Sequence, residues 1–139
     1  MEQVKLFEDL LVKLEAIENM AAGSEEKSKA EDAFYDSLEG WVYELLIKYR
    51  DAKSRKNSFI DFDNCPSENE IPALVDALKK CGVRHITISS RWSSMIEKTW
   101  TFCQAGCKIE GMVKINGRGR RFEVERDKAP AFLLNVEKQ

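Results

Sequence analysis

The chain has 139 residues, of which 43% are hydrophobic and 33% are charged, with only 7 Gly and 3 Pro. This size and composition are typical of a soluble globular protein, and they exclude collagen-like, low-complexity and disulfide-built secreted proteins. No apolar run approaches the roughly 20 residues that a membrane-spanning helix needs, so we expect no membrane contact. Residues 1–11 carry acids inside the first apolar stretch, unlike a secretory signal. We therefore expect a cytoplasmic protein in which residues 1–139 form a single domain.

The charge is distributed unevenly along the chain. Residues 1–50 hold 6 basic and 12 acidic residues, a net charge of −6, whereas residues 51–139 hold 16 and 12, a net charge of +4. The basic half is far less charged than a dedicated nucleic-acid-binding surface. This asymmetry favours a basic partner protein for the acidic half and allows at most a weak nucleic-acid contact for the basic half.

The first 56 residues have the apolar period of helices. One apolar stripe lies within residues 4–17, and a wider, aromatic stripe lies within residues 30–49. Gly23 suits the end of the first helix, and Ser24 suits the N-cap of the second. We expect residues 1–56 to form an antiparallel helical hairpin.

Residues 57–139 change to an alternation of strands and helices. Two helices, each opened by a Ser-x-x-Glu capping box and closed by Gly82 or Gly106, separate the first three strands. This order predicts a core of parallel strands with right-handed crossovers, and Asn116-Gly117 predicts a hairpin after it. Strands are expected at residues 59–63, 85–89, 108–115, 120–126 and 131–136.

The predicted fold class is α+β, with an N-terminal helical hairpin followed by β-α-β-α-β-β-β and a mixed sheet. The 57–139 subregion is the α/β part of the single domain. The last strand is apolar on both faces and is therefore not expected at a bare edge. Trp100 and Phe122 are predicted core residues, because each falls on the inner line of its element.

Asp61 and Asp63 form the first candidate site. They flank Phe62, and the Asp-Phe-Asp spelling resembles the start of the phosphotransfer site of haloacid-dehalogenase-like enzymes, with one Asp as nucleophile and the next as acid. Such a pair can also bind Mg²⁺. That family needs a later Lys and an acidic pair that cannot be placed here, so two solvated carboxylates at a strand end are the simpler interpretation.

Four further residues have spacings near those of zinc ligands: Cys81, His85, Cys103 and Cys107. Each pair straddles a helix end and the following strand, so adjacent strands would bring the pairs together. The alternative is that the cysteines are free thiols used as small apolar residues in a reducing compartment. We expect this alternative, with no metal and no cofactor.

The densest basic segment gives the candidate binding residues. Arg118, Arg120 and Arg121 lie at the predicted hairpin tip, and together with Arg91 and Trp92 they would bind phosphate or stack on a base. The alternative is a solvated turn that keeps the sheet edge soluble. Glycine-rich phosphate loops and a nucleophile elbow are missing from the sequence, so catalysis has no positive support.

Residues 71–117, IPALVDALKKCGVRHITISSRWSSMIEKTWTFCQAGCKIEGMVKING, carry a resemblance. They resemble short uncharacterised accessory proteins of mobile elements in gut Firmicutes bacteria. The resemblance implies a bacterial cytoplasm and a phage or plasmid context, and it implies no reaction.

These observations predict a small, non-catalytic, cytoplasmic binding or regulatory protein that acts through protein–protein contacts. The acidic helical hairpin is the expected contact surface. Three alternatives stay open: a nucleic-acid-associated protein that uses the basic tip, a mobile-element inhibitor of a host defence nuclease, and a metal-dependent phosphotransfer or nuclease enzyme that uses Asp61 and Asp63.

Overall fold

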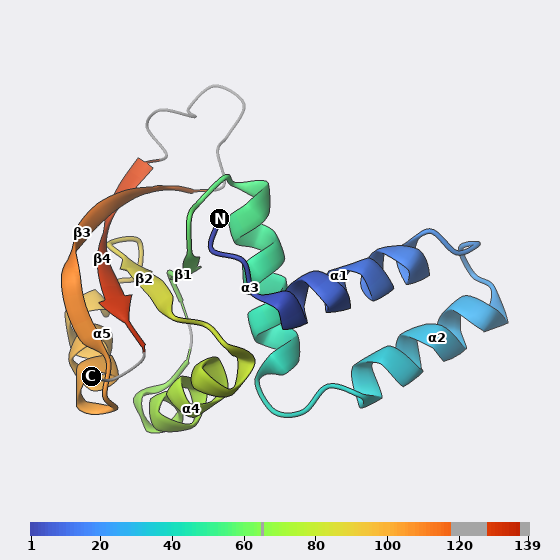
Figure 1. Cartoon of the computed structure of the whole chain (residues 1–139), viewed down its shortest axis with the longest axis horizontal. Coiled ribbons are helices and arrows are strands. Elements are labelled where there is room, and N and C mark those ends of the chain that lie inside the picture. Colours follow the sequence, from blue (N-terminus) through green and yellow to red (C-terminus); the bar gives the residue numbers. More distant parts are fainter. Residues whose placement is uncertain (65, 118–127, 137–139) are drawn as a thin grey trace.

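The computed structural model describes residues 1–64, 66–117 and 128–136. Within these residues it contains five α-helices and a four-stranded mixed sheet, which confirms the predicted α+β class. Figure 1 shows two parts: a body built from the sheet and three helices, and a pair of helices that projects from it. None of the described helices has both the length and the apolarity to cross a membrane.

The N-terminal part consists of three helices, not the two that were predicted. They are α1 (Lys5–Glu18), α2 (Glu25–Asp36) and α3 (Val42–Ser54). The predicted second helix is interrupted over residues 37–41, where Gly40 has a φ of +54° and the Ser37 hydroxyl donates to the Phe34 carbonyl. The apolar period hides this break, because Leu38 and Trp41 in the linker also pack against the core.

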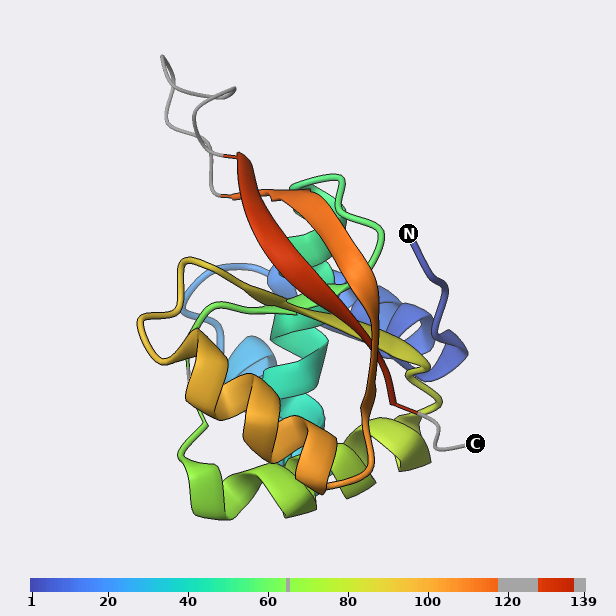
Figure 2. The ribbon, with the colours of Figure 1, turned by 90° about the vertical axis from the view of Figure 1, so that its left-hand side faces the viewer.

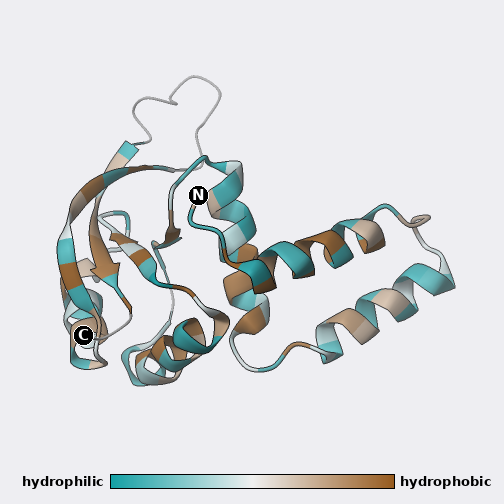
Figure 3. Cartoon of the chain, in the orientation of Figure 1, coloured by the Kyte–Doolittle hydropathy of each residue, from teal (hydrophilic) through white to brown (hydrophobic). Residues whose placement is uncertain are grey.

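The hairpin is therefore formed by α1 and α2, and we call residues 5–36 the acidic arm. The arm is attached mainly through α1, whose Phe7, Leu10 and Leu14 are buried, whereas Phe34 is the buried residue of α2. Figure 3 shows α2 largely in hydrophilic colours, while brown segments gather where α1 meets α3. Most of α2 is consequently exposed to solvent.

The sheet has the order β1-β2-β4-β3. Its strands are β1 (Ile60–Phe62), β2 (His85–Ser89), β3 (Lys108–Asn116) and β4 (Lys128–Asn135). β1 pairs with β2 in parallel, and β4 pairs antiparallel with both β2 and β3. β3 thus runs in the same direction as β2, as a crossover requires, but it is not β2's neighbour.

The prediction of three adjacent parallel strands was therefore wrong. The apolar last strand takes the central position between β2 and β3, which confirms that it is not a bare edge. A strand that is apolar on both faces buries more apolar surface at the centre of a sheet than at its edge. The predicted strand at residues 120–126 lies outside the described residues.

The helices of the body cover the apolar face of the sheet. α4 (Ile71–Cys81), which follows the short 3-10 turn η1 (Glu68–Glu70), and α5 (Met95–Gln104) pack together below the sheet in Figure 2, and α3 lies beside β1. Ile86 and Ile88 are fully buried, and the Phe62 and Phe102 rings lie 5.6 Å apart in this core. One apolar cluster thus holds the sheet and its helices together, and a second, smaller cluster of Ile115, Ala129 and Ala131 joins β3 to β4.

The expected core position of Trp100 was wrong. Trp100 is 65% exposed and Ile96 is 77% exposed, while Thr99 and Phe102 form the buried line of α5. The buried face is therefore turned by about one residue, roughly 100° around the helix, from the predicted one. Phe122, the other predicted core residue, lies outside the described residues.

Candidate functional site

Asp61 is placed by the pairing of two short strands. It lies in the middle of β1, opposite Thr87 of β2 in the parallel register. The Thr87 hydroxyl donates a hydrogen bond to Asp61 Oδ1 at 2.7 Å. Apolar neighbours on both sides, Ile60 and Phe62, hold the strand in the core, so Asp61 is only 9% exposed.

A cleft of about 570 Å³ opens between α3 and the end of β1. Among the described residues that line it, Asp61 is the one that is buried. Four of the lining residues carry carboxylates, namely Glu44, Asp51, Asp61 and Asp63. This volume lies in the range of small-ligand sites. Asp61, whose pKa is raised to about 6, is one of the lining residues, and perturbed pKa values are typical of functional sites.

The cleft also contains two cations and an apolar wall. Lys48 and Arg50 line it, as do Tyr43 and Ile47. Lys48 Nζ lies 5.1 Å from the centre of the Phe62 ring and 3.5 Å from Asn64 Oδ1. Because Arg50 Nη1 contacts Glu18 at 3.1 Å, its charge is compensated from the α1 side.

Burial dominates the ionisation of Asp61. Desolvation raises its pKa from 3.8 to about 6, although the Thr87 hydrogen bond, Lys48 and Arg55 act in the opposite direction and Asp63 adds to the rise. Asp61 Oδ2 has no hydrogen-bond partner in the described part of the chain, and the same is true of Arg55 Nε. An unpartnered carboxylate oxygen in a buried position costs free energy unless a ligand or water satisfies it.

Arg55, a further cation near Asp61, is already paired within the protein. Its side chain is 8% exposed and forms an ion pair with Asp51, one turn earlier on α3. In the described part of the chain, Glu44 and Asp63 form no ion pair. The cleft thus keeps an excess of negative charge that the surrounding protein does not neutralise.

This arrangement favours a cationic ligand, because carboxylates outnumber cations among the residues that line the cleft. A carboxyl whose pKa is about 6 can exchange a proton near neutral pH. In the described residues, however, no three His, Cys, Asp or Glu side chains gather as metal ligands do. Asp61 and Asp63 line the same cleft, and no third His, Cys, Asp or Glu of the described residues joins them as a metal ligand.

The predicted alternative zinc ligands are not assembled into such a group either. Cys81, Cys103 and Cys107 are free, and burial raises the pKa of each thiol, that of Cys107 to about 11. His85 is held between two carboxylates, with Nδ1 2.9 Å from Glu2 and Nε2 3.0 Å from Glu110. The histidine therefore ties the N-terminal segment and β3 to β2.

The predicted basic binding residues are only partly described. Arg118, Arg120 and Arg121 lie outside the described residues. Trp92 is 8% exposed, with Lys98 Nζ 5.7 Å from the ring centre, so its face is not available for stacking on a base. Arg91 lies in the exposed loop after β2, and its backbone N–H donates to the Ser89 hydroxyl.

The α3 residues of the cleft were not identified from the sequence. Tyr43, Glu44 and Lys48 fall within the second predicted helix, and nothing in their spacing points to Asp61. The packing of α3 against β1 is a tertiary feature, formed by segments that are separated in the chain. Only the acidic pair itself provided a signal.

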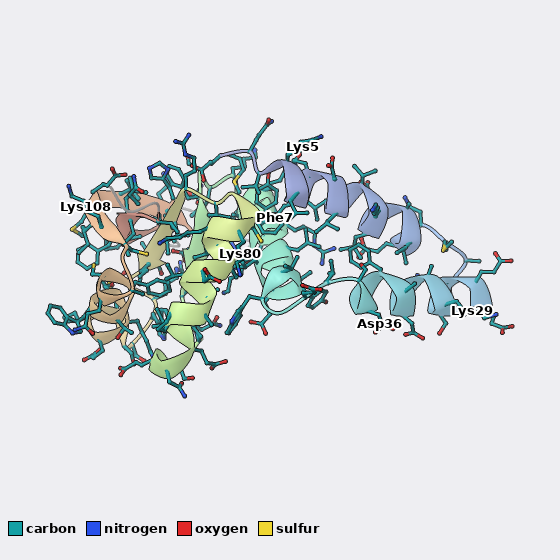
Figure 4. All side chains as sticks on the ribbon, turned by 60° about the horizontal axis from the view of Figure 1, so that its bottom comes forward. Lys5, Phe7, Lys29, Asp36, Lys80 and Lys108 are labelled. Atoms are coloured by element: carbon teal, nitrogen blue, oxygen red, sulfur yellow. The ribbon has the colours of Figure 1, made fainter. Side chains whose placement is uncertain are left out.

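The acidic arm adjoins this cleft. Residues 5–36 contain nine Asp and Glu and four Lys, a net charge of −5. Tyr35 of α2 and Tyr43 of α3 meet edge to face with ring centres 5.0 Å apart, and both are about two-fifths exposed. Figure 4 shows Lys29 and Asp36 on α2 at the opposite end of the molecule from Lys108. The arm and the cleft therefore form one acidic, partly aromatic side.

The comparisons assign a family but no activity. A family model described as a domain of unknown function, DUF7698, matches residues 44–136. The chain belongs to this family. The match begins in α3, so it includes Asp61 and most of the cleft but not α1 or α2. No curated protein and no solved structure shows significant similarity to the chain.

Proposed function

We propose that this DUF7698 protein is a non-catalytic binding protein that contacts a basic partner protein through its acidic arm. The observation that carries the proposal is the projection of α2 from the body. This helix has one buried residue, yet it has five acidic residues among twelve. A helix that contributes so little to the core is free to present its charge to a partner.

Packing explains why the arm keeps its position. The Phe7 and Tyr49 rings lie 5.2 Å apart, and the Tyr49 hydroxyl donates to Glu8 Oε2 at 2.6 Å. Lys53 Nζ contacts the same carboxylate at 3.0 Å. These contacts fix α1 on α3, so the acidic face of the arm is presented in a defined orientation and binding does not have to order it.

A second surface supports a binding role. Ile96 and Trp100 are exposed on α5, one turn apart, and Ile109 and Met112 are exposed on the edge strand β3. Large exposed apolar residues of this kind are typical of protein contact sites, in which Trp is a frequent energetic anchor. The cytoplasm is the proposed compartment, which the free thiols support.

The test is recovery of a partner from cells of the native host. The variant removes three exposed carboxylates of α2 by the substitutions Glu26→Gln, Asp32→Asn and Asp36→Asn. The control removes three exposed carboxylates of the body by Glu68→Gln, Asp76→Asn and Glu97→Gln, so that both variants have the same net charge.

We expect the wild type and the control to retain a basic protein, with binding weakened by salt, and the arm variant to lose it. Equal recovery by all three proteins would contradict the proposal. Loss with the body variant alone would instead place the contact on the α/β body.

A further inference from the structure

We propose that the cleft between α3 and β1 binds a guanidinium group, with Asp61 as the buried carboxylate that receives it. The inference deepens the proposed function, because an arginine side chain of the basic partner is the macromolecular source of such a group. It rests on the geometry of the cleft and not on the acidic arm.

The cleft has an unsatisfied acceptor at its most buried point. Asp61 is 9% exposed, Oδ1 is held by Thr87, and Oδ2 has no partner in the described residues. Asp63 and Glu44 lie around it in the same cleft without ion pairs in the described part of the chain. Because Oδ2 itself is fully buried, a donor that enters the cleft reaches it by a small movement of the covering side chains, and it then gains a charge-assisted hydrogen bond to an acceptor that no described side chain occupies.

The negative charge of the residues that line the cleft favours a cation as the ligand. Of the four carboxylates that line the cleft, Asp51 is paired with Arg55, and of the two cations, Arg50 is paired with Glu18. Three carboxylates, those of Glu44, Asp61 and Asp63, then remain against Lys48. An anion would be repelled by Asp63 and Glu44. No three described carboxylates gather as the ligands of a closed metal site do, and we therefore infer an organic cation.

The planar shape of a guanidinium and the apolar residues of the cleft favour this group over an ammonium group. A guanidinium has five N–H donors in a plane, so one group can donate to more than one carboxylate. It is more weakly hydrated than an ammonium group, so its transfer to a buried carboxylate costs less. Tyr43 and Ile47 line the same cleft, and they offer a ring for stacking and an apolar surface for the methylene stem of arginine.

The experiment is isothermal titration calorimetry with L-arginine amide, at low salt and at about pH 7.5, where Asp61 is ionised. The variant is Asp61→Asn, which keeps the size of the side chain and the oxygen that accepts from Thr87. The matched control is Asp76→Asn, an exposed carboxylate of α4 that is paired with Lys80. Circular dichroism confirms that each variant is folded.

We expect the wild type and Asp76→Asn to bind within about twofold of one another, because a surface carboxylate contributes little. Binding by Asp61→Asn should be weaker by about tenfold or more, since the buried charge partner is lost. Butylamine should bind more weakly than L-arginine amide. No heat with the wild type, or unchanged affinity in Asp61→Asn, would overturn the proposal.

A second set of titrations identifies the source of the guanidinium group. The tripeptide acetyl-Gly-Arg-Gly-amide presents arginine as a partner protein would, whereas agmatine presents it as a small molecule. Binding of the tripeptide supports the partner, and binding of agmatine alone overturns the link to a partner while the site itself stands. Failure of all guanidinium probes, with recovery of the partner still dependent on α2, would reject this site and leave the proposed function intact.

Discussion

Replacement of Asp61 by Asn should change the pH dependence of stability more than replacement of any surface carboxylate. The carboxyl is 9% exposed, and burial raises its pKa from 3.8 to about 6. The folded state therefore binds a proton more tightly than the unfolded state between these two values. The contribution of Asp61 to stability is most favourable below about pH 4, falls as pH rises towards 6, and is lost above that.

The size of the effect follows from the same shift. A rise of about two pKa units corresponds to roughly 3 kcal/mol of unfolding free energy at neutral pH. The amide that replaces the carboxyl has no charge to desolvate and keeps an oxygen for the Thr87 hydroxyl. Its buried NH₂ needs an acceptor, which costs about 1–3 kcal/mol if none is found. The net change at neutral pH is therefore a stabilisation of about 1 kcal/mol.

The assay is urea unfolding of the wild type and Asp61→Asn at about pH 4 and pH 7.5. The free-energy difference between variant and wild type should become more favourable to the variant by about 2–3 kcal/mol at the higher pH. The exposed Asp76→Asn variant is the control and should show no such change. Parallel pH profiles for Asp61→Asn and the wild type would refute the assigned burial and charge.

Three further substitutions test the packing by chemical denaturation. Tyr49→Phe removes the hydroxyl that donates to Glu8 and should cost about 1–2 kcal/mol. Burial raises the pKa of Tyr49 to about 12, so the wild type should lose more stability than Tyr49→Phe as pH rises from 10 towards 12. Phe102→Ala should cost about 3–5 kcal/mol, because the ring is fully buried. Trp100→Ser should change stability by less than about 1 kcal/mol. A large loss with Trp100→Ser, or a small one with Phe102→Ala, would show that the face of α5 is misassigned.

Local signals in the sequence were sufficient to place most elements. Gly82 ends α4 in the left-handed region, with a φ of +86°, and the Val83 N–H bonds back to Leu78, as a glycine C-cap predicts. The Ser67–Glu70 capping box is present at the start of the helical segment that contains α4. The β-branched run of residues 85–89 forms β2 with the predicted bounds. Each of these features depends on a few neighbouring residues.

The predictions were wrong where contacts between remote parts of the chain determine the structure. The apolar stripe of the second predicted helix continues through the linker at Leu38 and Trp41, so periodicity could not reveal the break at Gly40. The order of the elements indicated the direction of β3 but not its neighbour, because β4 inserts between β2 and β3.

The sequence indicated only part of the candidate site, because the rest depends on tertiary contacts. The spelling Asp-Phe-Asp drew attention to Asp61, but the burial of its carboxyl and the cleft against α3 depend on packing between segments that are remote in the chain.

The most direct test is chemical-shift mapping of the ¹⁵N-labelled protein during titration with an arginine-rich peptide. The central claim is that the acidic arm and the adjoining cleft form one surface for a basic partner. We expect the perturbed amides to cluster in α2, in the first half of α3 and around Asp61, with saturation at a defined ratio. Perturbations confined to α5 and β3, or small shifts spread over every exposed carboxylate without saturation, would contradict it.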